Sequence, residues 1–130
     1  MLGMEQYTVK ESDLDGLGHM NFNRYVLIMS EMRLKWLADV GLALDDLLAK
    51  QLGTALITFD TTYHKELRLG DTVDIETRVV KVGTKSFTML QRITLNGELC
   101  TDCNSVLVIM DLQARKAIEV PEEIKQHLYV

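Results

Sequence analysis

Residues 12–25 read SDLDGLGHMNFNRY, and an apolar run that contains no Pro or Gly follows them as far as Val40. Two acids and two glycines come first, and residue types of this kind favour a loop. His19 and Asn21 come next, and an Asn side chain is suited to accept a first-turn N–H of a helix. This stretch therefore predicts a short flexible loop that delivers a carboxylate to the start of a long helix.

The helix that follows is expected to run from its cap at Asn21 to about Val40 and to stop at Gly41, because Gly is common just after a helix end. Its apolar residues go most of the way round the cylinder, and such a helix is typically buried. Four polar positions would mark a narrow exposed strip or a site: Glu31, Arg33, Lys35 and Asp39.

After the helix the periodicity changes to that of strands. Strands are expected at residues 6–10, 54–64, 72–82, 86–95 and 98–110, with short helices at 43–51 and from Pro121 onwards. The alternation slips at Val79-Val80, which indicates a bulge, and Asn96-Gly97 predicts a type I′ hairpin turn. The fold class expected is α+β, one long helix against a five- or six-stranded, mostly antiparallel sheet, with four strands in a meander. One helix cannot cover both faces of this sheet, and its edges stay open, so self-association is expected.

The length, net charge, hydropathy and cysteine count of the chain limit the classes of function. A length of 130 residues predicts one domain, residues 1–130, with a real core. A net charge of −5 lacks the basic surface of a nucleic-acid binder. No apolar window approaches ~18 residues, so no membrane association is expected, and no secretory signal is visible. Two cysteines do not predict a disulfide framework, so a cytoplasmic, reduced protein is expected.

Two familiar motifs are incomplete here. A calcium loop starting at Asp13 fails because Leu17 and Arg24 stand where oxygen ligands are needed. Cys100 and Cys103 form a lone C-x-x-C in an expected strand, where residues three apart face opposite sides, so we expect buried or half-buried thiols without a redox or zinc role. His64 and His127 are isolated and are expected to be surface or strand residues.

The opening pattern resembles that of the hotdog-fold acyl-CoA thioesterases of the 4-hydroxybenzoyl-CoA thioesterase type. The matching positions are Asp13, Asp15, Gly18, His19, Asn21, Tyr25, Glu31 and Arg33, followed by Tyr63, Gly70-Asp71-Thr72-Val73 and Gly83-Thr84-Lys85-Ser86. The likeness covers nearly the whole chain. One residue separates Glu31 from Arg33 where the family pattern has two, and Glu66 stands where a Pro often follows the Tyr.

The resemblance implies a single hotdog domain that hydrolyses an acyl-CoA or acyl-ACP thioester without a metal or redox cofactor. It implies a homodimer or homotetramer with its site at a subunit interface. Asp15 takes the catalytic position, either attacking the thioester carbonyl or activating a water. First-turn N–H groups near Asn21 to Asn23 would polarise the carbonyl oxygen. The implied substrate-binding residues are Gly18, His19, Met20, Asn21, Phe22 and Tyr25.

Other interpretations of the same residues stay open. Asp15 fits an Asx-turn acid that holds its own loop, Asp13 fits a turn-stabilising role, and Glu31 and Arg33 fit a structural ion pair. At the level of function, the alternative is a non-catalytic hotdog protein that binds acyl-CoA. A hotdog hydratase is disfavoured, because it needs a His and an acid on or near the helix in a pattern that this chain lacks.

Overall fold

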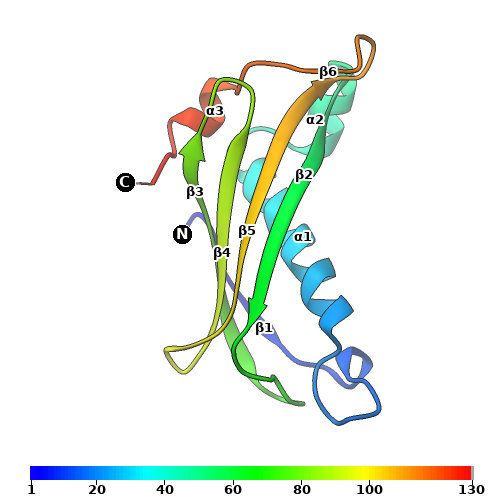
Figure 1. Ribbon diagram of the computed structural model, residues 1–130, viewed down its shortest axis with the longest axis vertical. Coiled ribbons are helices and arrows are strands. Elements are labelled where there is room, and N and C mark those ends of the chain that lie inside the picture. The colour runs from blue at the N-terminus through cyan, green and yellow to red at the C-terminus, as the bar shows by residue number, and fades with distance from the viewer. Residues whose placement is uncertain (130) are drawn as a thin grey trace.

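The computed structural model describes residues 1–129, in which one long helix lies against a curled sheet (Figure 1). In chain order the elements are β1 (Met4–Thr8), a 3-10 turn (Glu11–Asp13), α1 (Phe22–Asp39), α2 (Leu44–Ala49), β2 (Leu52–Tyr63), β3 (Thr72–Val82), β4 (Phe87–Leu95), β5 (Glu98–Asp111), β6 (Lys116–Ala117) and α3 (Glu122–Lys125).

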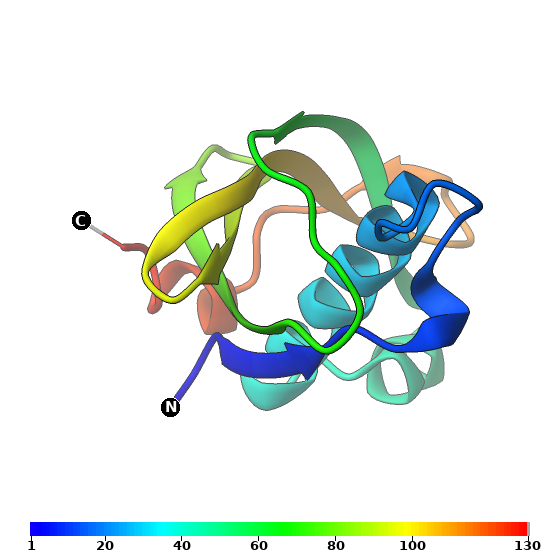
Figure 2. The ribbon, with the colours of Figure 1, turned by 90° about the horizontal axis from the view of Figure 1, so that it is seen from below.

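The strands form one antiparallel sheet in the order β1-β3-β4-β5-β2, and β6 pairs with β5. Seen from below, the sheet bends around α1, and the Glu11–Gly18 loop lies beside the first turn of that helix (Figure 2). This is the α+β hotdog arrangement expected from the sequence, with a long helix wrapped by an antiparallel sheet.

The expectation that the four strands after α1 form a meander is wrong for the connection between β2 and β3. β3, β4 and β5 are joined as consecutive hairpins, but β2 pairs with β5 and lies at the far edge from β3. Residues 64–71 carry the chain across the molecule from β2 to β3 (Figure 2). Such a segment is longer than a hairpin loop needs, and the alternation within each strand does not say which strands are neighbours.

Local chemistry sets the two ends of α1 as expected. Asn21 is the N-cap, and its side-chain oxygen accepts the Asn23 N–H at 2.8 Å. Gly41 follows the helix with φ +94, a backbone conformation that favours glycine. The expected bulge of β3 is confirmed by a register shift between Val79 and Lys81. The turn at Asn96-Gly97 has positive φ at both residues, as a type I′ turn requires.

The core lies between one side of α1 and the inner face of the sheet. Ile28, Met29, Trp36 and Leu37 are buried there. The opposite side of the helix remains uncovered in this chain, and two large apolar side chains on it are exposed: Leu27 and Leu34. Phe22, in the first turn on the side of Met29, is exposed as well. The expectation of burial on most sides is therefore wrong for one copy of the chain, because a single sheet covers a single side of the helix.

The two cysteines depart from the expected geometry. Both are fully buried free thiols in the same core cluster. The pairing of β5 with β4 shifts at this point, since Ile93 lies opposite Thr101 while Thr94 lies opposite Leu99. Cys100 is left without a partner in the ladder, and this extra residue turns both cysteines inward.

No helix among the described residues is long and apolar enough to span a membrane.

Candidate active site

The loop before α1 is closed on itself. Leu14 and Met20 form an isolated antiparallel bridge, and the Asp15 N–H donates to the His19 carbonyl at 3.1 Å. Gly18 adopts φ +81, which a residue with a side chain rarely does. Gly16 is not among the residues with positive φ, so only Gly18 is required by the backbone of this loop. The closed loop holds Asp15 and His19 close to the start of α1.

Asp13 is the anchor of the loop. Its carboxylate is fully buried and accepts hydrogen bonds from the Tyr7 hydroxyl, from the Lys10 N–H at 2.9 Å and from Arg24 Nε at 2.8 Å. Burial alone would raise the pKa of Asp13, but these three donors outweigh it and lower the pKa below its usual value. The contacts tie β1, the 3-10 turn and α1 together, which agrees with the structural role expected for Asp13.

Asp15 is more accessible than Asp13 and has one oxygen committed to the loop. Its Oδ1 accepts the Leu17 N–H at 2.8 Å in an Asx turn. Its Oδ2 lies 3.5 Å from His19 Nδ1, and the side chain is 24% exposed. The Asx turn therefore exists, and it fixes one carboxylate oxygen while the other faces the imidazole ring.

The first turn of α1 offers one free backbone donor. The Asn21 N–H bonds to the Asp13 carbonyl at 2.8 Å, and the Asn23 N–H is taken by the Asn21 side chain at 2.8 Å. The Arg24 N–H bonds to the Asn21 carbonyl. The Phe22 N–H has no hydrogen-bond partner among the residues that the structure describes. It lies at the positive end of the helix dipole, where a donor can stabilise a developing oxyanion.

A cavity of about 270 Å³ opens between this helix start and the segment that follows β2. Its lining residues are His19, Met20, Phe22, Tyr25, Tyr63, His64, Lys65 and Glu66. The Tyr25 ring packs edge-on against the Tyr63 ring, with 5.1 Å between centroids. Burial raises the pKa of Tyr25 to about 12, so its hydroxyl stays neutral at physiological pH.

Four of the residues implied by the resemblance line this cavity, namely His19, Met20, Phe22 and Tyr25. Three do not: Gly18 shapes the loop, Asn21 caps the helix, and Asp15 reaches the site only through its contact with His19. The structure forms no Glu31–Arg33 pair among the described residues, since Glu31 is exposed and Arg33 is buried against the sheet.

The other wall of the cavity comes from residues to which sequence reasoning gave no site. Tyr63 matched a family position without a role, and His64 was expected to be an ordinary surface or strand residue. His64 is accessible and lies 3.2 Å from Asp102. Lys65 pairs with Glu98 at 2.9 Å. Tyr63 ends β2, and His64 and Lys65 follow it. These residues reach the start of α1 only through the tertiary fold, so no spacing in the sequence brings them together.

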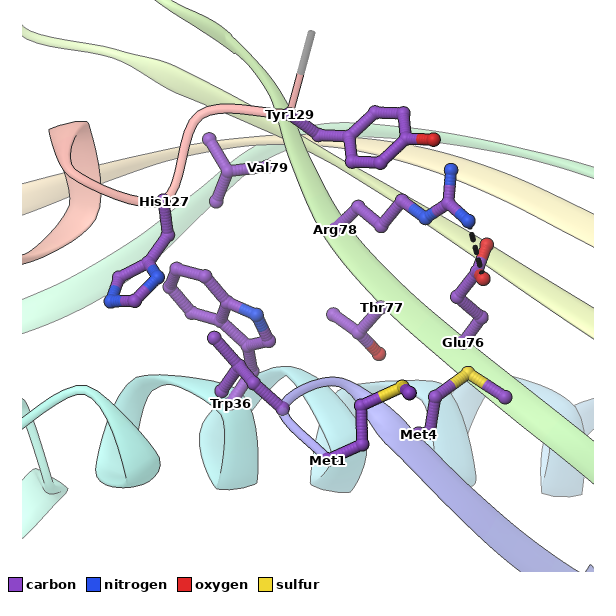
Figure 3. Close-up of a pocket in the computed structure, with 10 residues that line it drawn as sticks. Met1, Met4, Trp36, Glu76, Thr77, Arg78, Val79, His127 and Tyr129 are labelled. Atoms are coloured by element: carbon purple, nitrogen blue, oxygen red, sulfur yellow. Dashed lines mark hydrogen bonds and ion pairs between the residues drawn. The ribbon is translucent and has the colours of Figure 1, made fainter.

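A second cavity, of about 240 Å³, lies beside β3 between the N-terminal residues and the C-terminal His127–Tyr129 segment (Figure 3). Its charged groups already pair with each other: Arg78 bonds Glu76 at 2.6 Å and stacks 4.0 Å from the Tyr129 ring centre. The His127 ring packs edge-on against Trp36. No residue of the Asp15 loop lines this cavity, and we assign it no reaction.

Fold and site together define a hotdog protein whose polar loop meets the start of its central helix. Residues 9–128 match the family model of the thioesterase-like superfamily, and the chain belongs to that superfamily. This confirms the expectation, drawn from the opening motif, of a 4-hydroxybenzoyl-CoA-thioesterase-like family of thioester hydrolases.

Known relatives are distant but cover almost the full length. The long-chain acyl-CoA thioesterase FadM of Escherichia coli is 25% identical over 95% of this chain and 94% of its own. SAV2348 of Staphylococcus aureus, solved in complex with CoA, has a TM-score of 0.90 at 21% identity, covering 97% of this chain and 80% of its own. Slr0204 of Synechocystis, a 1,4-dihydroxy-2-naphthoyl-CoA thioesterase, has a TM-score of 0.86 at 18% identity, covering 95% of this chain and 93% of its own.

Proposed function

We propose that this chain hydrolyses an acyl-CoA or acyl-ACP thioester to the free acid and the thiol, with Asp15 as the catalytic carboxylate. One observation carries the proposal. The His19 ring lines the cavity at the start of α1 and lies 3.5 Å from the Asp15 carboxylate oxygen that the loop leaves free. A carboxylate next to a residue that lines a cavity, together with an unpaired N–H in the first turn of the same helix, supports a site for acyl transfer to water.

Asp15 has two routes to the same products. As a base, its Oδ2 takes a proton from a water, whose oxygen bonds to the acyl carbon. As a nucleophile, Oδ2 itself bonds to the acyl carbon, the C–S bond breaks, and water then hydrolyses the mixed anhydride. In both routes the Phe22 N–H donates to the carbonyl oxygen as it gains charge, and the thiolate leaves and takes up a proton. A single turnover in ¹⁸O-labelled water tests the nucleophilic route, because water that attacks the Asp15 carbonyl of the anhydride leaves an unlabelled Asp15 oxygen in the acid, which the base route never does.

The thiol half of the substrate is proposed from the comparisons. FadM is a long-chain acyl-CoA thioesterase, and SAV2348 was solved in complex with CoA. The proposed binding residues are those on the loop and first turns, Gly18, His19, Met20, Asn21, Phe22 and Tyr25. The neutral Tyr25 hydroxyl and the apolar Met20 and Phe22 side chains suit an uncharged acyl group near the thioester.

We further propose that two copies associate along β2, with the site completed at their interface. β2 pairs only with β5 among the described strands, so its other edge is open. Leu56, Ile57 and Phe59 on this strand are exposed. A long apolar edge strand is a template for pairing with another strand, and an antiparallel pair of β2 edges would be closed by two-fold symmetry.

We propose the cytoplasm as the compartment, since both cysteines are free thiols.

The experiment is hydrolysis of an acyl-CoA panel, followed by thiol release, for the wild type and for Asp15→Ala and Asp15→Asn. We expect turnover of at least one thioester by the wild type and loss of at least about a hundredfold in kcat in both variants. Full activity in both variants would refute the role of Asp15. A wild type that acyl-CoA stabilises against heat but never hydrolyses it would instead support the non-catalytic binding protein.

A further inference from the structure

Arg33 is a buried cation without a counter-ion. This α1 side chain is 7% exposed, and its Nη1 donates to Gln91 Oε1 at 3.0 Å and to Ser105 Oγ at 3.2 Å. Both acceptors are neutral, and no carboxylate lies within ion-pair distance of Arg33 in the part of the chain that the structure describes. Its Nε and Nη2 have no hydrogen-bond partner there either. A buried guanidinium is costly unless an anion pairs with it.

The guanidinium lines a cavity of about 240 Å³ between α1 and the inner side of the sheet. The other walls are apolar or carry hydroxyls, and they include Ser30, Leu34, Thr54, Leu56 and Leu107. This cavity is separate from the one beside His19, since the two share no lining residue. Arg33 therefore combines unpaired donors, Nε and Nη2, with a place in the wall of an empty space.

Two further side-chain hydroxyls, on the face of the sheet that carries Ser105, have no hydrogen-bond partner. The hydroxyls of Thr61 and Thr101 are buried without a hydrogen bond. Thr61 lies opposite Cys103 in the ladder, and Thr101 lies opposite Tyr63. Residues that alternate along β5 share a face, so Thr101 and Cys103 lie on the same side as Ser105, which contacts Arg33. Unsatisfied hydroxyls are rare in native structures and indicate a missing partner.

The cavity at Arg33 and the candidate active site lie on one seam between α1 and β2. At one end the Tyr63 hydroxyl donates to the Phe22 carbonyl at 3.5 Å, and at the other end Thr54 and Leu56 face the cavity of Arg33. The two elements run in opposite directions side by side (Figure 1). The apolar side chains of Leu56 and Phe59 along the seam are exposed.

The length of the seam sets the length of a ligand that reaches both sites. Phe22 and Arg33 are separated by about 16 Å along the helix at 1.5 Å per residue. The Arg33 side chain leans toward the helix N-terminus and shortens this distance. Because a C–C bond of about 1.5 Å advances an extended chain by about 1.3 Å, about ten to twelve carbons span the remainder.

We propose that Arg33 binds the far end of the acyl group, and that the preferred substrates are thioesters of about ten to twelve carbons whose acyl chain ends in a carboxylate. This inference rests on the proposed function and names its substrate class. Nε and Nη2 form the fork that pairs with a carboxylate through two parallel hydrogen bonds. The rival source of the anion is a carboxylate from a second copy of the chain.

The test compares two non-hydrolysable thioethers, S-dodecyl-CoA and S-(ω-carboxyundecyl)-CoA, by calorimetry. They match in length and differ in the terminal group. We expect the wild type to bind the carboxylated compound about ten- to a hundredfold more tightly, as for a hydrogen-bonded charge pair. Arg33→Gln is expected to remove the preference. Gln91→Glu keeps the guanidinium, gives it an internal counter-ion, and is expected to remove the preference as well.

Leu34→Ala is the matched control, because it alters the same cavity without altering its charge. We expect it to change both affinities in the same direction and to preserve their ratio. Equal affinity of the wild type for the two thioethers would overturn the proposal, as would an undiminished preference in Arg33→Gln and Gln91→Glu. Conversion of Arg33→Gln to monomers with the preference intact would assign the anion to the second copy and also overturn it. Because binding needs no turnover, loss of this preference and failure of Asp15 catalysis are distinguishable.

Discussion

Two acids two residues apart in one loop have separate tasks. Asp13 is fully buried and accepts three hydrogen bonds, whereas Asp15 keeps one oxygen beside His19, whose side chain lines the cavity. The spacing of the motif identifies both positions. It does not show that Asp13 is the buried anchor, because its partners Tyr7 and Arg24 come from β1 and α1.

The lowered pKa of Asp13 gives the fold a predictable acid sensitivity. A carboxyl whose pKa is lower in the folded than in the unfolded state stabilises the fold above the unfolded value, and this stability is lost as pH falls through the folded value. We expect Asp13→Asn to lower the free energy of unfolding at pH 7 by about 2 kcal/mol. The deficit relative to the wild type should shrink steadily below about pH 4.

Urea denaturation at a series of pH values measures this effect. Asp15→Asn serves as the comparison, because it removes only one turn acceptor and should cost less than about 1 kcal/mol. A deficit for Asp13→Asn that is the same at acidic and neutral pH would contradict the assigned role.

At the scale of elements, features that a few adjacent residues determine, such as helix ends and tight turns, were predictable from the sequence. Asn21 and Gly41 specify the ends of α1, and Asn96-Gly97 specifies a hairpin, because a cap or a tight turn is decided by a few adjacent residues. Features that depend on partners far along the chain, such as the order of the strands, were not predictable from the sequence. The position of β2 beside β5 and the extra residue at Cys100 are properties of strand pairing, which alternation alone does not reveal.

The same division applies to the candidate site. The loop side, His19 to Tyr25, follows from one contiguous motif, whereas the wall after β2 was missed because the fold brings it there. Arg33 was placed among the polar residues of α1, yet its burial depends on Gln91 and Ser105 of two other strands.

The cap of α1 is testable on its own. Asn21→Ala removes the acceptor of the Asn23 N–H, and we expect it to lower the free energy of unfolding by about 1 kcal/mol. Asn23→Ala keeps the backbone N–H that the cap binds and changes an exposed side chain with no hydrogen bond among the described residues, so it should change this energy by less than about 0.5 kcal/mol. Thermal and urea unfolding of the two variants side by side measure the difference, and equal losses would argue against the cap.

At the scale of the whole molecule, one chain leaves its apolar surface unfinished. One side of α1 and the edge strand β2 both expose large apolar side chains, and the two elements lie next to each other in Figure 1. A large exposed apolar surface on a protein indicates an interaction site, and a second copy placed along β2 would cover these side chains. The proposed self-association and the proposed site therefore share the same edge of the molecule.

Charge introduced at this edge should separate the copies. Ile57 on β2 is 57% exposed, and Leu69, in the loop before β3, is 59% exposed. We expect Ile57→Lys to reduce the molar mass measured by light scattering to that of one chain, and to reduce thioester hydrolysis with it. Leu69→Lys is equally exposed but lies away from β2, and it should retain the mass of the wild type. An unchanged mass in both variants would place any interface elsewhere.

The catalytic identity of Asp15 is tested most directly by kcat at saturating acyl-CoA for Asp15→Asn and Glu11→Gln. Both changes replace an acid of the same loop by its amide, and Glu11 is exposed, with no ion pair among the described residues. We predict a loss of at least about a hundredfold for Asp15→Asn and a change of less than about twofold for Glu11→Gln, with both variants folded. A folded Asp15→Asn protein with the kcat of the wild type would contradict the account.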